Sequence, residues 1–254
     1  MIRKTLVVAL LILSPFAWAT ADIYQDAVMN KERSAKDRER DARELPVEVL
    51  KFAGFKPGMR VADVFGGGGY YSELISYIVG PKGEVLLVNN APYNEFAKEG
   101  LKEHFTPGRL PNVKRVTADP CNLKGCNLRL GKGVLDAALI VMSYHDLYFK
   151  DEKGGWPELD AGNFLDQINR ALKPGAPFLI VDHAALEGTG SSAAQELHRI
   201  DEQFARKDIT SHGFKYEGSF DKLRNPNDDR GVVVFNPAVR GKTDRFVHLY
   251  RKSK

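Results

Sequence analysis

Short apolar runs alternate with amphipathic stretches along most of the chain. Runs typical of buried strands occur at 61–65, 84–88, 113–117, 134–142 and 177–181. Helical spacing of apolar residues occurs at 70–79, 93–104, 161–172 and 193–209. Beyond Gly213 the pattern predicts several further strands. Strands that alternate with helices and read as continuous apolar runs indicate a parallel sheet that is covered on both faces.

The segment before these units has a different pattern. Residues 24–44 are rich in charge, and opposite charges three and four positions apart suit a solvated helix. We interpret this helix as an exposed face, although an N-terminal helix of this kind can also cover a ligand site. Residues 45–52 predict a short amphipathic helix that ends before Gly54.

Four consecutive glycines, Gly66 to Gly69, follow the first predicted strand directly and lead into the helix that begins at Tyr70. Glycine permits a left-handed backbone and a close approach of the chain to a ligand. The N-terminus of the following helix adds N–H donors and a partial positive charge. The order strand, glycines, helix therefore predicts a ligand site at this loop.

Other polar residues follow the remaining strands, where doubly wound sheets bind their ligands. They are Asn89, Asn90, Asp119, Ser143, Tyr144, His145, Asp146, Asp182 and His183. A dinucleotide-binding loop would carry a third glycine or alanine at the position of Ser72 and an acid at the position of Asn89. The nicotinamide-cofactor interpretation therefore matches the pattern poorly.

The motif spacing resembles that of class I S-adenosylmethionine-dependent methyltransferases. Asp63 lies in the first strand, Gly67 and Gly69 alternate after it, and Asp119 follows the third strand. Asp136 at the start of the fourth strand and the segments 168–175 and 213–217 complete an ordered match over 45–254. The resemblance implies a doubly wound α/β fold with a mostly parallel seven-stranded sheet and helices on both faces. It also implies S-adenosylmethionine as the cofactor, bound by Asp63, Gly67, Gly69, Asn89 and Asp119.

Two residues depart from the family pattern. Phe65 stands where the family has its first glycine, and its bulk would narrow the approach to the methionine end of the cofactor. Asn89 stands where an acid usually holds the ribose hydroxyls. An amide lacks the charge-assisted strength of a carboxylate, so an Asn89→Asp substitution is expected to strengthen cofactor binding.

More narrowly, the chain resembles a group of exported methyltransferases with a His-Asp pair after the fourth strand and an Asn-Pro-x-Asp-Asp stretch, here 225–229, near the end. We predict that His145 serves the methyl acceptor as a base, because a histidine of near-neutral pKa suits proton removal. Asp146 contributes charge beside it. A hydrogen-bonded structural histidine is the alternative, and His183 and His198 are lesser candidates. We predict no metal ligands.

The first 21 residues have the pattern of a secretory signal peptide. Arg3 and Lys4 precede an uncharged apolar stretch that ends in Ala17-Trp18-Ala19. A membrane anchor is the alternative, and no second apolar run is long enough to span a bilayer. The expected organisation is a signal peptide at 1–21, a charged helical segment at 22–44 and a methyltransferase-like domain at 45–254. We expect an exported, periplasmic protein without stable membrane insertion.

Cys121 and Cys126 lie five positions apart in the sequence. A redox motif would separate them by two residues, and a metal site would need further ligands nearby. In an oxidising compartment we predict that they form a structural disulfide.

Charge adds little to this picture. The net charge of +4 includes Arg3 and Lys4, and basic residues are scattered among acidic ones. Nucleic-acid binding therefore has no support. We predict methyl transfer from S-adenosylmethionine, a small-molecule cofactor, to an unidentified acceptor. A non-catalytic binding module with the same fold and an NAD(P)-dependent oxidoreductase are the alternatives, and the sequence sets no oligomeric state.

Overall fold

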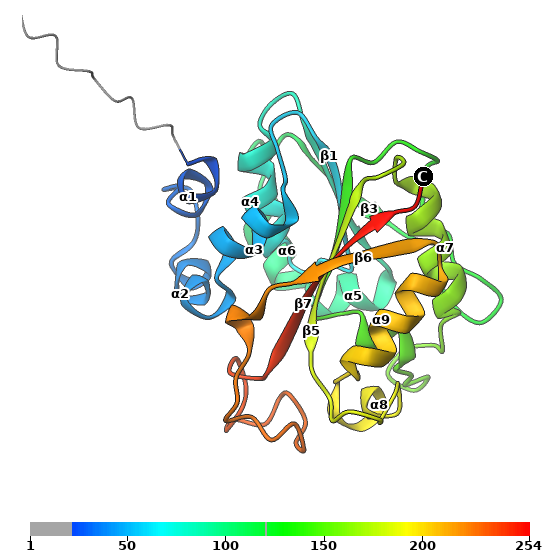
Figure 1. The fold of residues 1–254 in the computed structure, drawn as a ribbon. Helices are drawn as coiled ribbons and strands as arrows, with labels where there is room; N and C mark the ends of the chain where they lie inside the picture. The colour runs from blue at the N-terminus through cyan, green and yellow to red at the C-terminus, as the bar shows by residue number, and fades with distance from the viewer. Residues whose placement is uncertain (1–21, 120) are drawn as a thin grey trace, which may run out of the picture.

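The computed structural model describes residues 22–119 and 121–254. Its centre is a seven-stranded sheet in the order β3-β2-β1-β4-β5-β7-β6, with helices on both faces (Figure 1). The first five strands are parallel, and β7 runs antiparallel to both β5 and β6. The predicted α/β fold is confirmed. The strands are β1 (Arg60–Val64), β2 (Glu84–Asn89), β3 (Val113–Thr117), β4 (Ala137–Val141), β5 (Pro177–His183), β6 (Phe214–Ser219) and β7 (Arg245–Lys252).

Nine α-helices and two 3-10 turns connect the strands of the described part of the chain. They are α1 (Ile23–Val28), α2 (Ala35–Glu44), α3 (Pro46–Ala53), α4 (Tyr70–Val79), α5 (Ala91–Phe96), α6 (Lys98–His104), η1 (His145–Tyr148), α7 (Ala161–Ala171), α8 (Ala193–Leu197), α9 (Glu202–Ser211) and η2 (Asp221–Leu223).

Three predicted helices are interrupted in the structure. The charged segment forms α1 and α2, and the stretch 93–104 forms α5 and α6. The stretch 193–209 breaks at His198, which has a left-handed backbone with φ 52° and ψ 47°. Asp201 then starts α9 by accepting hydrogen bonds from the N–H groups of Gln203 and Phe204.

The sheet separates two hydrophobic cores. On one face α1, α3 and α4 bury side chains such as Leu50 and Leu74. On the other face α7 and α9 bury Phe164, Ile168 and Ile209. These helices cover the opposite faces of the sheet in Figure 1. Strands that contribute alternate residues to two dry cores explain the continuous apolar runs in the sequence.

Most residues of helix α2 are exposed, but part of the charged segment is buried against the rest of the molecule. Arg33, Asp37 and Glu44 are all less than 5 % exposed. The guanidinium of Arg33 donates to the carbonyl of Val28 at 2.8 Å, and Arg245 of β7 donates to the Glu44 carboxylate at 2.6 Å. Buried charges require partners of this kind. The charges of α2 therefore fasten it to the rest of the molecule.

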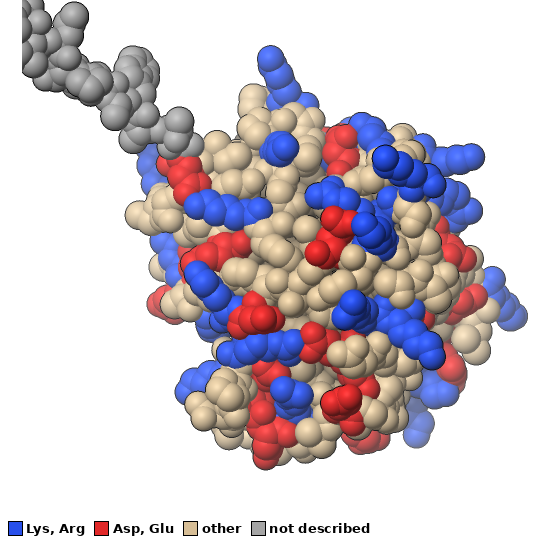
Figure 2. Space-filling view, viewed as in Figure 1, with Lys and Arg blue, Asp and Glu red and all other residues tan. Residues whose placement is uncertain are grey.

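Two further predictions concern the pair of cysteines and the signal peptide. Cys121 and Cys126 are joined in a disulfide, as expected. The predicted signal peptide lies outside the described residues. Within 22–119 and 121–254, no helix has the length and apolarity needed to cross a membrane. On the face shown in Figure 2, basic and acidic side chains are interspersed and form no basic stripe.

Candidate functional site

A cavity of about 260 Å³ lies at the glycine loop, beyond the carboxyl end of β1. Gly66, Gly67 and Gly68 form one wall, and residues of α2, α4, α5 and α6 form the others. We call it the glycine-loop cavity. Gly69 caps α4 without any side-chain hydrogen bond to the first turn. The first N–H groups of a helix attract negatively charged or polar ligand groups.

Asp63 lies directly beneath this loop. A Cβ atom added to Gly66 would come within 2.4 Å of the Asp63 carboxylate, so only glycine fits there. Ser72 donates a hydrogen bond to Oδ2 of Asp63 at 2.7 Å. Oδ1 has no partner among the described residues, although it is buried. Burial raises the pKa of Asp63 to about 6, and the bond from Ser72 opposes this rise.

Asn89 ends β2 and holds the loop rather than facing the cavity. Its Oδ1 accepts from the N–H of Gly67 at 3.1 Å, and its Nδ2 donates to the carbonyl of Gly67 at 2.9 Å. Asn94 of α5 accepts a further bond from Nδ2 at 3.2 Å. The side chain is 1 % exposed. The structure thus places Asn89 beside the predicted cofactor loop, and its amide group is bonded to Gly67 and Asn94.

The structure places two other predicted cofactor residues away from the cavity lining. The Cα of Gly69 faces Phe105, whose ring would lie 2.8 Å from an added Cβ atom. Asp119 pairs with Arg129 on the surface, and this guanidinium lowers the pKa of the carboxylate. By contrast Asp63 and Gly67 line the cavity as predicted.

Phe65 lines the edge of the glycine-loop cavity, but its ring turns into the core. The backbone has a left-handed φ of 53°, which a glycine at this position would adopt without strain. The ring stacks on Tyr93 at 4.5 Å between centroids and also contacts Phe164 at 4.9 Å. The side chain therefore supports α5, which covers the loop.

A second cavity of about 270 Å³ adjoins the first. Both are lined by Tyr93, Phe96 and Met142, which form the partition between them. The rest of its lining is mainly aromatic or imidazole: His145, Phe149, Trp156, His183, His198 and Phe235. We call it the aromatic cavity. Such a lining suits a flat, largely apolar molecule with a few polar groups.

His145 forms part of the wall of the aromatic cavity and is 3 % exposed. Its Nδ1 lies 2.7 Å from Oδ1 of Asp182, and its Nε2 lies 3.2 Å from Oδ1 of Asp146. Burial alone would lower the pKa of His145, but the two carboxylates outweigh burial and raise it to about 10. A histidine that is protonated at neutral pH does not accept a proton, so this geometry does not favour the predicted base role.

Asp146 lines the aromatic cavity and bonds to Tyr93 of the partition. Burial tends to raise its pKa, but the imidazolium of His145 outweighs this and holds the pKa well below its usual range. One carboxylate oxygen faces the rings of His145 and His198, and the other accepts a hydrogen bond from the hydroxyl of Tyr93. The predicted neighbour of His145 in sequence is therefore also its partner in space.

His183 differs from His145 in its charge state. Burial lowers its pKa well below the usual value, and the positive charges of His145, Arg245 and Arg199 lower it further. Its Nδ1 lies 2.7 Å from the hydroxyl of Thr243, and the ring lines the aromatic cavity. A neutral imidazole in a cavity wall can accept a proton.

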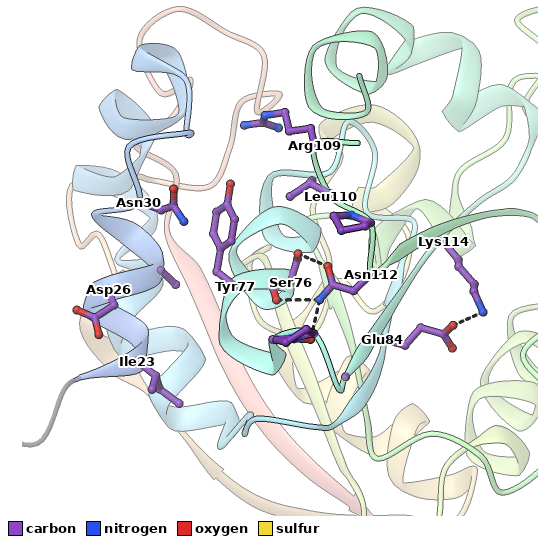
Figure 3. Close-up of a pocket in the computed structure, with 15 residues that line it drawn as sticks. Ile23, Asp26, Asn30, Ser76, Tyr77, Glu84, Arg109, Leu110, Asn112 and Lys114 are labelled. Atoms are coloured by element: carbon purple, nitrogen blue, oxygen red, sulfur yellow. Dashed lines mark hydrogen bonds and ion pairs between the residues drawn. The ribbon is translucent and has the colours of Figure 1, made fainter. Parts of the chain in front are cut away.

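A larger cavity, about 740 Å³, lies at the opposite, amino ends of the strands and does not join the other two (Figure 3). Its polar groups bond to one another: Asn112 donates to the carbonyls of Ser76 and Gly80, and Lys114 pairs with Glu84. We assign no ligand to this trough.

This sheet order, with β7 antiparallel between β5 and β6 and a glycine loop after β1, defines the class I S-adenosylmethionine-dependent methyltransferase fold. A methyltransferase from Aquifex aeolicus superimposes with a TM-score of 0.53 at 21 % identity, covering 80 % of this chain and 87 % of that one. The [4+2]-cyclase SpnF superimposes with a TM-score of 0.54 at 17 % identity, covering 89 % of this chain and 86 % of the cyclase.

Sequence comparison finds relatives that match part of the chain. The chain is similar to the ubiquinone/menaquinone biosynthesis C-methyltransferase UbiE of Shewanella sp. strain W3-18-1, with 29 % identity over 135 residues. The match covers 53 % of this chain and 46 % of the relative, so the chain spans about half the length of the curated relatives it matches. No protein-family model matches the chain.

Some residues of the site were missed by sequence reasoning. Arg40 lines the glycine-loop cavity, although its charge pattern predicted solvent exposure. Tyr93 and Met142 form the partition, and neither stands in a recognisable motif. Met142 has a left-handed φ of 53°, which no residue type at that position signals. The one available signal was position, since Met142 is the last residue of the fourth predicted run, 134–142.

Proposed function

We propose that this protein transfers a methyl group from S-adenosylmethionine to a small aromatic acceptor. The observation that carries the proposal is the pair of adjoining cavities at the carboxyl edge of the sheet, which share Tyr93, Phe96 and Met142. A methyl donor in the glycine-loop cavity and an acceptor in the aromatic cavity would meet at this partition. Methyl transfer requires such in-line placement of donor and acceptor.

The glycine-loop cavity fits the amino-acid end of the cofactor. Oδ1 of Asp63, buried and without a partner among the described residues, can accept a hydrogen bond from the ammonium group. Lys36 and Arg40 line the same cavity and suit the carboxylate. Within residues 22–119 and 121–254, Nε of Arg40 is also buried without a partner.

The ribose end needs a group other than Asn89. Glu103 of α6 lines the glycine-loop cavity and is exposed, so its carboxylate is available to ribose hydroxyls. Asn89 acts indirectly, because its two bonds to Gly67 fix the backbone that the cofactor contacts.

S-adenosylmethionine, when bound, supplies a methyl group on a positively charged sulfur, and the acceptor atom takes this carbon as the carbon–sulfur bond breaks. The acceptor's proton then has to leave. We assign its removal to His183, whose ring lines the aromatic cavity, rather than to His145, both of whose ring nitrogens face carboxylates. Phe149, Trp156 and Phe235 would pack against a flat ring. The similarity to quinone-biosynthesis methyltransferases supports a ring of this kind.

Calorimetry tests the proposal directly. The protein is titrated with S-adenosylmethionine, S-adenosylhomocysteine and NAD. We expect saturable binding of the first two at one site and no binding of NAD. Absence of binding of either sulfur compound would overturn the proposal in favour of a non-catalytic module, and binding of NAD alone would favour an oxidoreductase.

We also propose that the chain is exported and that it functions in the periplasm. The basic start, the apolar stretch and the Ala-x-Ala exit support this, and a disulfide suits an oxidising compartment. N-terminal sequencing of protein from the periplasmic fraction should begin at Thr20 or Asp22. Recovery of intact Met1 in the membrane fraction would contradict cleavage.

A further inference from the structure

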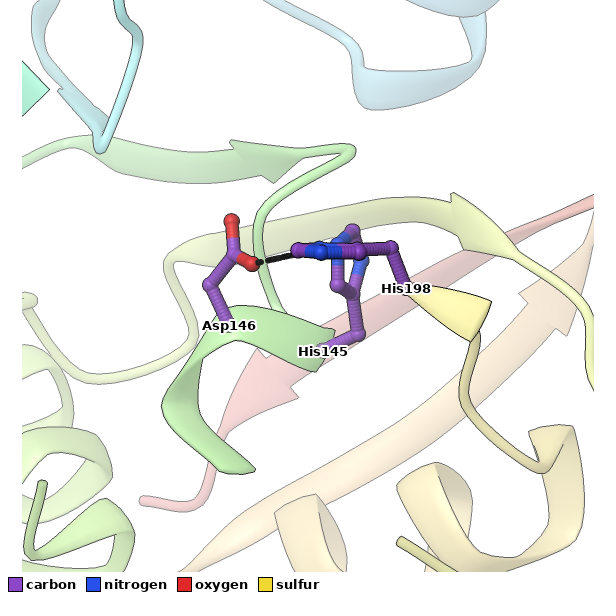
Figure 4. Close-up of side chains that lie close together, drawn as sticks. All are labelled: His145, Asp146 and His198. Carbon is purple, nitrogen blue, oxygen red and sulfur yellow. Dashed lines mark ion pairs between the residues drawn. The ribbon is translucent and has the colours of Figure 1, made fainter. Parts of the chain in front are cut away.

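Three potential metal-ligating atoms converge on the wall of the aromatic cavity. They are Nε2 of His145, Oδ1 of Asp146 and Nδ1 of His198, and all lie within 4.8 Å of one another. Figure 4 shows the carboxylate of Asp146 and the two rings gathered at the end of η1 and the end of α8. Sequence reasoning predicted no metal ligands, because His198 is separated from the other two residues by more than fifty positions.

The distances suit a tetrahedral ion. Oδ1 of Asp146 lies 3.2 Å from Nε2 of His145 and 3.4 Å from Nδ1 of His198. Ligand atoms about 2.0–2.1 Å from Zn²⁺ at tetrahedral angles are roughly 3.3 Å from each other. Two imidazoles and one carboxylate also form the ligand set of catalytic zinc sites, which keep the fourth position open.

The partners of these ligands are those that metal sites use. Nδ1 of His145 lies 2.7 Å from Oδ1 of Asp182, whose Oδ2 accepts the backbone N–H of His145 at 2.8 Å. A carboxylate on the far nitrogen fixes the ring and strengthens it as a ligand. The other oxygen of Asp146 is held by the hydroxyl of Tyr93. His145 and Asp146, the two candidate ligands on η1, are therefore oriented before an ion binds.

His198 has a strained backbone, and a buried ion pair made by the next residue holds this segment in place. Its left-handed backbone, with φ 52°, is uncommon for a residue other than glycine and directs the ring toward the cluster. The next residue, Arg199, is fully buried and makes two bonds to Asp228 at 2.8 and 3.1 Å. Asp228 belongs to the Asn-Pro-x-Asp-Asp stretch at 225–229, which the sequence singled out only through a family resemblance. That stretch thus anchors the segment that presents His198.

We propose that His145, Asp146 and His198 bind one divalent transition-metal ion of the zinc type at the wall of the aromatic cavity. All three residues line that cavity. The open position of the ion would therefore face the acceptor site of the proposed function, where it suits an oxygen or sulfur atom of the bound molecule. Metal binding itself does not depend on methyl transfer. Without an ion, a proton between His145 and Asp146 occupies the same place.

A second cluster, Asp37, Glu73 and His104, offers a comparison. All three residues are buried, and Arg109 already pairs with Glu73 at 2.5 Å. The guanidinium of Arg109 therefore already occupies the position of a cation beside Glu73. The two clusters differ in that Arg109 supplies a permanent positive charge to the second, whereas Asp146 pairs only with the two histidines among the described residues.

The experiment measures zinc in the whole protein after chelation and reconstitution. Atomic absorption and titration with Zn²⁺ alone should give one ion per chain for the wild type. His198→Gly keeps the left-handed backbone at no steric cost and removes one ligand, and Asp146→Asn removes another at constant size. Both should lose stoichiometric zinc. Asp182→Asn should weaken zinc binding about 10–100-fold, the range for a residue that orients a ligand.

Two matched variants serve as controls. His212→Ala removes another histidine paired with an aspartate, Asp166 at 2.8 Å, and His104→Asn removes the histidine of the second cluster. Both should keep one zinc ion per chain. Co²⁺ in place of Zn²⁺ should give a visible absorption spectrum that His198→Gly abolishes. Retention of zinc by folded His198→Gly and Asp146→Asn, or its loss only in His104→Asn, would overturn the proposal. Calorimetry with S-adenosylhomocysteine reports on the cofactor site separately.

Discussion

Asn89 and Gly67 hold each other through a reciprocal pair of hydrogen bonds, in which the amide side chain accepts from the backbone N–H and donates to the backbone carbonyl of the same residue. A carboxylate cannot donate, so Asn89→Asp would place an oxygen against the Gly67 carbonyl. The sequence alone suggested that this substitution would strengthen cofactor binding, and the structure predicts the opposite. We expect a stability loss of about 1–3 kcal/mol, the cost of an unsatisfied buried group, and weaker S-adenosylhomocysteine binding.

Urea unfolding and calorimetry measure the two effects. Asn94→Asp is the matched control, because it keeps the oxygen that accepts from Asn89 and loses only an exposed bond to Thr117. Tighter binding by Asn89→Asp would restore the original expectation that residue 89 faces the ribose.

Arg40 should contribute to cofactor affinity through charge. Arg40→Gln removes a guanidinium that lines the glycine-loop cavity. A hydrogen bond to a charged group contributes about 1.5–3 kcal/mol, so the dissociation constant for S-adenosylhomocysteine should rise by tenfold or more. Lys31→Gln removes an exposed positive charge of the same segment that lines none of these cavities, and it should leave the constant unchanged. Equal effects of both substitutions would indicate a general charge effect.

His104 should make stability depend on pH. Burial lowers its pKa, but Asp37 and Glu73 outweigh burial and raise it from 6.5 to about 9. A raised pKa in the folded state means that the stabilisation is complete below about pH 6.5 and is lost as the pH rises through about 9. The shift corresponds to a stabilisation on the order of 3 kcal/mol. Unfolding free energies of wild type and His104→Asn should therefore differ most at pH 6 and converge above pH 9. A constant difference across this range would contradict the assignment.

The disulfide between Cys121 and Cys126 closes a short loop. Replacing both residues by serine should lower the free energy of unfolding by about 2 kcal/mol through loop entropy. The mass of the unreduced peptide should be lower by two hydrogens. Two freely alkylated thiols in protein from its native compartment would contradict the pairing.

His183 and His145 can be separated by kinetics. His183→Asn should keep the affinity for S-adenosylhomocysteine and lower turnover by roughly 10²–10⁴, the usual range for losing a general base. Turnover is followed as S-adenosylhomocysteine formed with a panel of phenols and hydroquinones. Full activity of His183→Asn, with loss in a folded His145→Asn variant, would return the base role to His145.

The sequence predicted the sheet and the glycine loop because both depend on local pattern. The run of β1 (Arg60–Val64) is buried on both faces, and a Cβ at Gly66 would collide with Asp63 only a few residues away. It could not predict that Glu44 of α2 is buried, because Glu44 finds its partner Arg245 at the other end of the chain. The sequence also did not predict that His145 and His198 lie close together, because these two residues are far apart along the chain. The spacing of residues in the sequence indicates which side chains are neighbours along one helix or strand. It does not indicate contacts between segments that are far apart in the chain.

The bond between Glu44 and Arg245 joins residues 201 positions apart and has a consequence for the order of folding. Helix α2 is made among the first residues of the described chain and is held to α4 and α6 through Asp41 and Asp37. Its bond to Arg245, however, can form only after β7, the last strand, has entered the sheet. Bringing such distant segments together carries a high loop-closure cost and tends to be slow. A nascent or truncated chain that lacks β7 would thus have the glycines, the strand and the helix in place, but would lack the bond that fastens the last residue of α2.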